Sequence, residues 1–164
     1  MEPLLLALHV AAAAVWVGGM AFAHFCLRPA AFELLPPPQR VPLMVGALGR
    51  FFRWVAGAIV LLWATGLWRL GRVGFADAPP GWHAMTGLAA VMTVIFGVIA
   101  HGVFPRVRAA SQAGRFPDAA AGLGRIRTLA AGNLGLGLAT SAASTAHRRA
   151  RARTAAPSRA GRRP

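Results

Sequence analysis

The sequence predicts an all-α protein, an integral membrane four-helix bundle, and three observations support that prediction. The 164-residue chain is 56% hydrophobic, which is more than a soluble domain of this size usually contains. Its apolar residues are gathered in long runs, and the first run, residues 4–27, carries no formal charge. A helix of that length crosses a hydrocarbon core of about 30 Å. Arginine, tryptophan and proline residues flank the runs, as they do at the ends of membrane spans.

The first span is predicted over residues 4–27. Arg28 and Pro29 follow directly, and proline disfavours helical geometry in the residue before it. Residues 28–38 are then expected to form a loop, in which the three prolines that start at Pro36 interrupt helical structure.

The second span is predicted over residues 51–70. Residues 39–53 are mildly amphipathic and predict an interfacial helix that leads directly into this span, with Pro42 in its first turn. Trp54 and Trp68 lie close to the two ends of the span, where tryptophan rings anchor helices in the membrane interfaces.

The third span is predicted over residues 82–104, closed by Pro105 and followed by a polar loop. The fourth span, residues 128–146, is rich in Ala and Gly, and such small residues let helices approach closely. A continuous helix that starts near Asp118 fits this segment best. Asn133 lies inside it and is expected to link helices through hydrogen bonds.

The chain divides into a membrane domain, residues 1–146, and an Arg-rich tail, residues 147–164. The tail has no large apolar residue and cannot bury a core, so it is expected to be disordered. All 18 basic residues are Arg, and the formal net charge is +14. These residues lie between the hydrophobic runs and in the tail rather than on a folded basic face. The predicted partners are therefore the lipid bilayer and its anionic lipids, and nucleic acid is not expected.

Little in the sequence supports catalysis. The four acidic residues, Glu2, Glu33, Asp77 and Asp118, lie in predicted loops or termini, which argues against a carboxylate pair or a proton relay inside the membrane. Cys26 is the only cysteine, so neither an intramolecular disulfide nor a paired-cysteine zinc site can form. The sequence by itself does not predict an enzyme.

Four histidines lie in the first and third spans. At about 100° per residue, His9 and His24 differ by about 60° around their helix, and His83 and His101 share one face. The two spans run in the same direction in a four-span topology, so we expect His9 and His83 near one membrane side and the other two near the opposite side. Imidazole binds copper and haem iron, and thioethers suit Cu(I). With nearby methionines included, the candidate metal ligands are His9, His83, Met85, His24, His101 and Met20. Hydrogen bonding between helices is the alternative role for each histidine.

Six short motifs resemble the CopD-like (copper resistance D domain) family of small integral membrane proteins. They are LHVAAAAVWVGG at residues 8–19, LRPAA at 27–31, GRFFRWV at 49–55, TGL at 65–67, HAM at 83–85 and IRTLAAGNLGLGL at 126–138. The resemblance runs over most of residues 4–140. The chain is more distantly similar to HemJ-type protoporphyrinogen oxidases, haem-binding four-helix proteins of the same broad superfamily.

The resemblance implies a multi-pass protein of the bacterial inner (plasma) membrane that acts in copper homeostasis or resistance. Carried over by motif, His9 and His83 are the implied cofactor-binding residues, with copper or haem b held between helices. Two alternatives stay open, a HemJ-like haem-dependent membrane oxidoreductase and a non-catalytic structural or assembly protein. Further candidate partners are a copper-handling or redox protein and a second copy of the chain.

Overall fold

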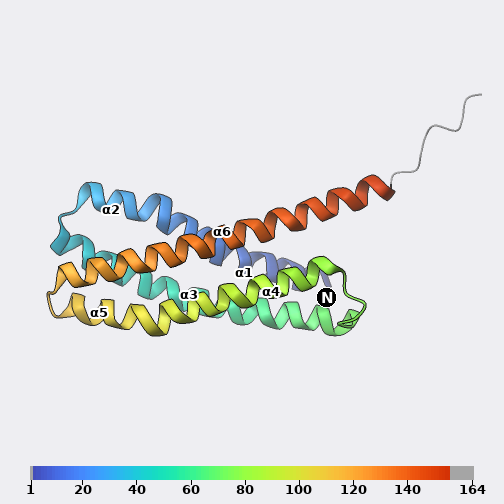
Figure 1. Cartoon of the computed structure of the whole chain (residues 1–164), viewed down its shortest axis with the longest axis horizontal. Coiled ribbons are helices and arrows are strands. Elements are labelled where there is room, and N and C mark those ends of the chain that lie inside the picture. The colour runs from blue at the N-terminus through green and yellow to red at the C-terminus, as the bar shows by residue number, and fades with distance from the viewer. Residues whose placement is uncertain (1, 156–164) are drawn as a thin grey trace, which may run out of the picture.

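The structure, a computed structural model, describes residues 2–155 of the chain and the side chains of residues 3–139. Every regular element in this range is helical, and the predicted all-α class is confirmed (Figure 1). In chain order the elements are α1 (Glu2–Phe22), η1 (Ala23–Leu27), α2 (Arg28–Leu34), α3 (Pro37–Val73), α4 (Pro80–Gly97), η2 (Val98–Val103), α5 (Phe104–Gln112) and α6 (Phe116–Ala155). The two η elements are single π-helical turns between α-helices.

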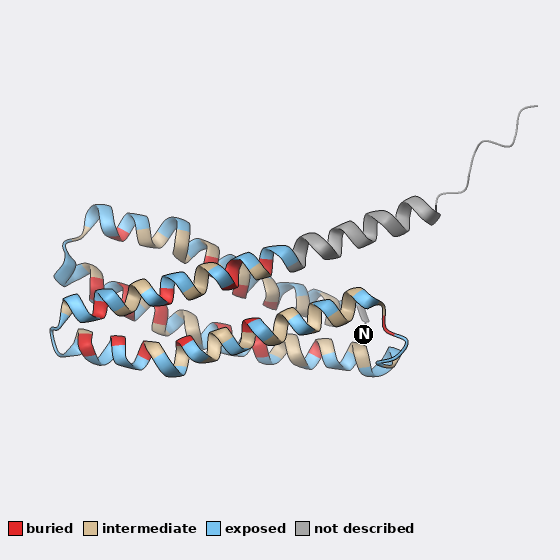
Figure 2. Cartoon of the chain, viewed as in Figure 1, coloured by how far each residue is buried: buried red, intermediate tan, exposed pale blue. Residues whose placement is uncertain are grey.

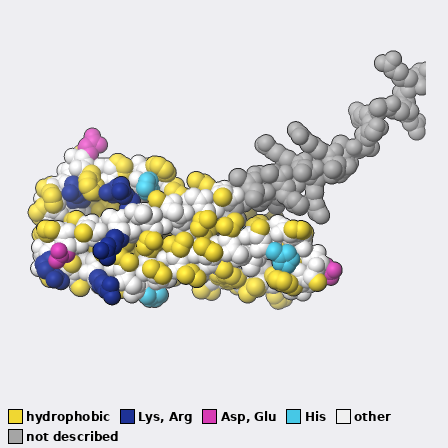
Figure 3. Space-filling view, in the orientation of Figure 1, with side chains coloured by type: hydrophobic (Ala, Val, Ile, Leu, Met, Phe, Trp, Pro, Cys, Tyr) yellow, Lys and Arg dark blue, Asp and Glu magenta, His cyan; other side chains and the backbone are white. Residues whose placement is uncertain are grey.

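The helices run side by side along the long direction of the bundle, so helices begin and end at its two ends (Figure 1). At one end, called here the amino-terminal end, α1 and α4 begin and α3 stops. At the other end α2 and α5 stop, and α3 and α6 begin. Arg side chains gather over this second end on the face that Figure 3 shows, so we call it the basic end. The two helices that carry the histidines therefore run in the same direction, as the four-span topology predicted.

Three helical segments of the described chain are long and apolar enough to cross a membrane: Pro3–Leu34, Pro37–Val73 and Pro80–Gln112. They establish a multi-pass membrane protein by length and composition. The helix α6 has 40 residues but is not among these segments, so the fourth span at residues 128–146 stays a prediction.

The chain remains helical through Pro29 and Pro105, which were expected to end spans, and this corrects the sequence prediction. A proline lacks the N–H that would bond to the carbonyl four residues earlier, and its ring crowds that carbonyl. A π-turn precedes each proline and absorbs the defect by moving the bonding one residue further back. In η1, for example, the N–H of Arg28 donates to the carbonyl of Ala23.

The other boundaries differ from the prediction in the same direction, towards longer helices. The expected loop at residues 28–38 shrinks to residues 35–36. The interfacial helix leads directly into the second span, as predicted, but α3 is longer than residues 39–70 at both ends, and Pro42 lies beyond its first turn. The helix α5 occupies the segment after Pro105 where a polar loop was expected. The start of α6 near Asp118 is confirmed, and the helix continues to Ala155, into the predicted tail. Residues 156–164 of that tail lie outside the described residues.

Two clusters of buried side chains hold the helices together (Figure 2). The cluster nearer the basic end consists of Val41, Val45, Leu48, Ile99, Phe104, Val107, Ala110, Ala119 and Ile126. The second consists of Trp16, Met20, Val55, Ile59, Met92 and Leu134. Glycine permits close approach beside both clusters. A side chain at Gly122 would overlap Val107, and a side chain at Gly19 would overlap the ring of Phe51.

Candidate functional site

His9 lies on the packed side of α1 and reaches across to α3. Its Nδ1 atom is 2.7 Å from Oγ1 of Thr65, a residue that is only 3% exposed. Positions seven apart lie on one side of an α-helix. Trp16, seven residues after His9, is buried, so this side of α1 faces the interior of the bundle. His9 is therefore oriented by a neighbouring helix and does not face lipid freely.

The hydrogen bonds of Thr65 determine which nitrogen of His9 carries the proton. The Thr65 hydroxyl donates to the carbonyl oxygen of Leu61 at 2.7 Å, with the carbonyl of Leu62 at 3.2 Å. A hydroxyl has one hydrogen, so its oxygen is left to accept a hydrogen bond from His9 Nδ1–H. We assign His9 this tautomer on that basis. Its Nε2 atom then has a free lone pair, which is the form in which imidazole binds a metal ion.

His83, the second implied ligand, lies near the start of α4, also at the amino-terminal end. Its ring packs edge-to-face against Phe75 of the α3–α4 loop, with 4.5 Å between ring centroids. Met85 is partly buried in the same helix. Nearby, the guanidinium carbon of Arg69 lies 5.3 Å from the ring centroid of Trp82, so a cation–π contact links α3 to α4 at this end.

The histidines expected near the same membrane side do not form direct contacts in the part of the chain that the structure describes. No hydrogen bond or ring contact there joins His9 to His83 or His24 to His101. The described residues also contain no group of three or more His, Cys, Asp or Glu side chains that could hold a metal ion. A metal bound at any one of these histidines would need thioether ligands or a ligand from another molecule.

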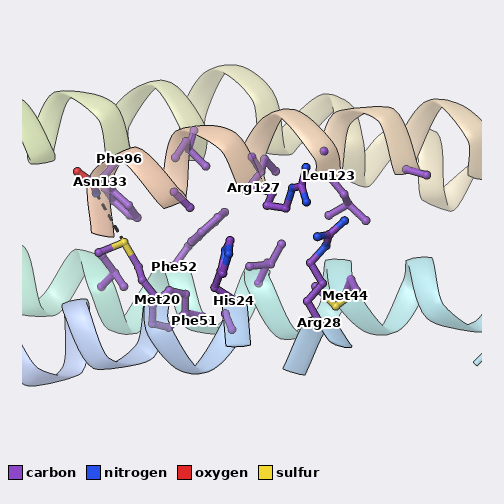
Figure 4. Close-up of a pocket in the computed structure, with 18 of the residues that line it drawn as sticks. Met20, His24, Arg28, Met44, Phe51, Phe52, Phe96, Leu123, Arg127 and Asn133 are labelled. Carbon is purple, nitrogen blue, oxygen red and sulfur yellow. Dashed lines mark hydrogen bonds between the residues drawn. The ribbon is translucent and has the colours of Figure 1, made fainter. Parts of the chain in front are cut away.

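A cavity lies towards the basic end, between α1, α3 and α6 (Figure 4). Its volume is about 940 Å³ when the open mouth is counted. Figure 4 shows His24 pointing into the cavity, with Met20 towards one end and Met44 towards the other. The structure thus brings together two predicted ligands, His24 and Met20, and adds Met44, which sequence reasoning missed. Phe51 and Phe52 from α3 and Phe96 from α4 supply aromatic walls.

Three arginines line one end of this cavity. Arg28 comes from α2, Arg40 from α3 and Arg127 from α6. The guanidinium carbons of Arg28 and Arg40 lie 4.7 Å and 3.8 Å from the ring centroid of Phe32, and Figure 4 shows Arg28 and Arg127 extending into the same space. Among the described residues, none of the three forms an ion pair with a carboxylate, whereas Arg115 pairs with Asp118 at 3.9 Å.

Asn133 closes the opposite end of the cavity. It is 2% exposed, and its Nδ2 donates to the sulfur of Met20 at 3.7 Å, so the expected link between helices is present. Its Oδ1 atom is buried and has no hydrogen-bond partner within the described chain. A buried carbonyl oxygen without a donor is unusual, and it makes this end of the cavity polar.

The last predicted ligand, His101, lies in the π-turn η2 and is exposed, whereas His24 lies in the π-turn η1 and is partly buried. Turns of this kind often occur at functional sites. Thr65 was not predicted as a site residue. Its only signal in the sequence is a hydroxyl in the interior of an apolar span, where side-chain hydrogen bonds between helices are expected.

The family model CopD, Copper resistance protein D, matches residues 45–147. The matched range contains Thr65, His83 and Asn133 and begins after the helix that carries His9. Comparison with curated proteins and with solved structures gives no match.

Proposed function

The chain belongs to the copper resistance protein D family, and from this membership and the geometry of His9 we propose that it handles copper as a multi-pass protein of a bacterial inner membrane. Copper is its substrate in this proposal. The observation that carries it is the hydrogen bond between His9 and Thr65. Histidines that bind metals usually donate their second N–H to a fixed acceptor, which sets the tautomer and the ring orientation. His9 has this arrangement.

In this proposal His9 Nε2 donates its lone pair to the metal and Thr65 holds the ring. His83 and Met85 lie at the same end of the bundle, and they are the candidates for further imidazole and thioether ligands. Imidazole accepts copper, and thioether ligands favour the Cu(I) state. The matched range and the first helix would then each supply part of the site.

The cavity around His24 is a poorer place for a metal cation. Arg28, Arg40 and Arg127 line it, and positive charges oppose the entry of another cation. We therefore assign copper to His9 rather than to His24 and Met20, although those two side chains line the same cavity.

A copper titration tests the assignment. Protein purified in non-ionic detergent competes for Cu(I) with a chromogenic chelator under anaerobic conditions. We expect wild-type protein to remove copper from the chelator and His9→Ala to lose that ability. His101→Ala is the matched control, because it removes an exposed imidazole from the parallel helix and should bind as wild type does. Copper binding that persists in His9→Ala would contradict the assignment.

The haem b alternative has a separate readout. The protein is prepared from cells supplied with copper and a haem precursor, and its visible absorption spectrum is recorded oxidised and after reduction with dithionite. The copper proposal expects no Soret band. A Soret band that disappears in His9→Ala would instead identify a haem protein and replace this proposal.

A further inference from the structure

We propose that the cavity between α1, α3 and α6 binds an amphipathic anion with a carboxylate or phosphate at one end, an apolar body and a hydroxyl at the other end. Its acidic group is held by Arg28, Arg40 and Arg127, and its hydroxyl donates to Asn133. The site is separate from His9, and the inference does not depend on the copper proposal.

The three guanidinium groups favour an anion as ligand. They come from three different helices and line one cavity, and none has a carboxylate partner among the described residues. Arg28 and Arg40 both contact the ring of Phe32, which holds their charges near each other. Like charges gathered in this way repel, and a bound anion removes that cost. Guanidinium groups also bind carboxylate and phosphate through paired hydrogen bonds.

The walls of the cavity favour an apolar body behind the acidic group. Phe51 and Phe52 stand between the arginine end and the Asn133 end in Figure 4, and Phe96 lies beside Asn133. A free inorganic ion would leave this apolar surface uncovered.

Asn133 identifies the group at the far end of the ligand. Its Oδ1 is an acceptor without a donor in the described chain, while one N–H of its Nδ2 donates to the sulfur of Met20. The ligand must therefore bring a donor, and a hydroxyl is the simplest one. Arg127 and Asn133 are six positions apart on α6, which is about 9 Å along the helix axis. The acidic group and the hydroxyl are thus separated by several bonds.

Two matched acids test the inference. Decanoate and 10-hydroxydecanoate differ only in the distal hydroxyl, and each is titrated by calorimetry into the purified full-length protein in non-ionic detergent, with titrations into empty micelles subtracted. We expect the hydroxy acid to bind about fivefold more tightly, the typical value of one neutral hydrogen bond. Asn133→Leu should bind both acids equally. A wild-type protein that does not distinguish the two acids would overturn the assignment of Asn133.

The arginine end has its own matched pair of variants. Arg127→Gln should weaken binding of both acids about tenfold, as expected for a charged hydrogen bond. Arg125→Gln removes the same charge two residues earlier on α6, does not touch the cavity lining, and should leave binding unchanged. Equal effects of the two substitutions would refute a specific anion site, because general attraction to a basic surface would then explain binding.

Additional ligands distinguish the source of the anion. Inorganic phosphate should not displace the hydroxy acid at equal concentration, since it lacks the apolar body. Phosphatidylglycerol and phosphatidylcholine test the bilayer as the source. Displacement by both lipids alike would overturn the proposal, because zwitterionic and anionic head groups would then be equivalent. Far-UV circular dichroism of each variant verifies that the helices are intact.

Discussion

Replacement of Gly19 by alanine should destabilise the bundle, and the neighbouring Gly18 provides the reference. A methyl group at Gly19 would overlap the Phe51 ring and lie 2.8 Å from its Cζ, whereas a methyl group at Gly18 would have no atom within 4 Å. Overpacking a filled site costs about 1–3 kcal/mol. Both substitutions gain about 1 kcal/mol of helix propensity, and this gain cancels when the two variants are compared. The difference between them is therefore about 2 kcal/mol.

Thermal unfolding in detergent, followed by far-UV circular dichroism, measures this difference. For a chain of this size, about 2 kcal/mol corresponds to a Tm that is roughly 4–8 °C lower for Gly19→Ala than for Gly18→Ala. The Phe51 ring packs beside the buried Trp16 cluster, which limits how far it can move away. Equal Tm values for the two variants would refute the reasoning, since Phe51 would then yield to the methyl group without cost.

Three further experiments test individual hydrogen bonds. Thr65→Val keeps the branched shape but removes the acceptor for His9 Nδ1, so Cu(I) affinity in the chelator competition should fall about tenfold to a hundredfold. Unchanged affinity would mean that copper binding by His9 does not depend on its hydrogen bond to Thr65. Trp63→Phe removes the 3.1 Å bond from Trp63 Nε1 to Thr93 Oγ1 that joins α3 to α4, and a double-mutant cycle with Thr93→Val should give a coupling near the average for membrane helices, about 0.6 kcal/mol. Asn133→Leu should raise the free energy of unfolding of the ligand-free protein by about 1 kcal/mol, because the gain from removing the unpaired Oδ1 outweighs the loss of the weak hydrogen bond to the Met20 sulfur. A lower Tm would show that Oδ1 has a partner.

The helical class could be predicted because it follows from the lengths of the apolar runs. In a membrane, backbone groups must bond within the segment itself, so a long uncharged run becomes a helix wherever it lies in the chain. The helix ends could not be read with the same certainty. Arg28 and Pro29 fit the local signal for a stop, but the π-turn η1 accommodates the proline and α2 continues. The local sequence shows that a proline destabilises the helix. Whether the helix nevertheless continues depends on how the next turn packs against its neighbours.

The side of the first helix on which its two histidines lie also followed from the sequence, while their partners did not. The angle between His9 and His24 placed both towards one side of the first helix, and both are partly buried on the side that carries Trp16 and Met20. The acceptor for His9, however, lies 56 positions away at Thr65. Nothing in the spacing of the histidines indicates which helix lies opposite or which of its turns meets the imidazole.

The sequence by itself determined a multi-pass helical membrane protein of the CopD family, with two histidines towards one side of its first helix. Hydrophobic length, helical period and short motifs are local properties, and each can be read along the chain. Only the tertiary structure decided that Arg28, Arg40 and Arg127 line one end of a cavity and that Asn133 closes the other. That convergence depends on how each helix is rotated and where it crosses its neighbours. Rotation and crossing are set by the packing of whole helix faces, such as Gly19 against Phe51, and no single segment encodes them.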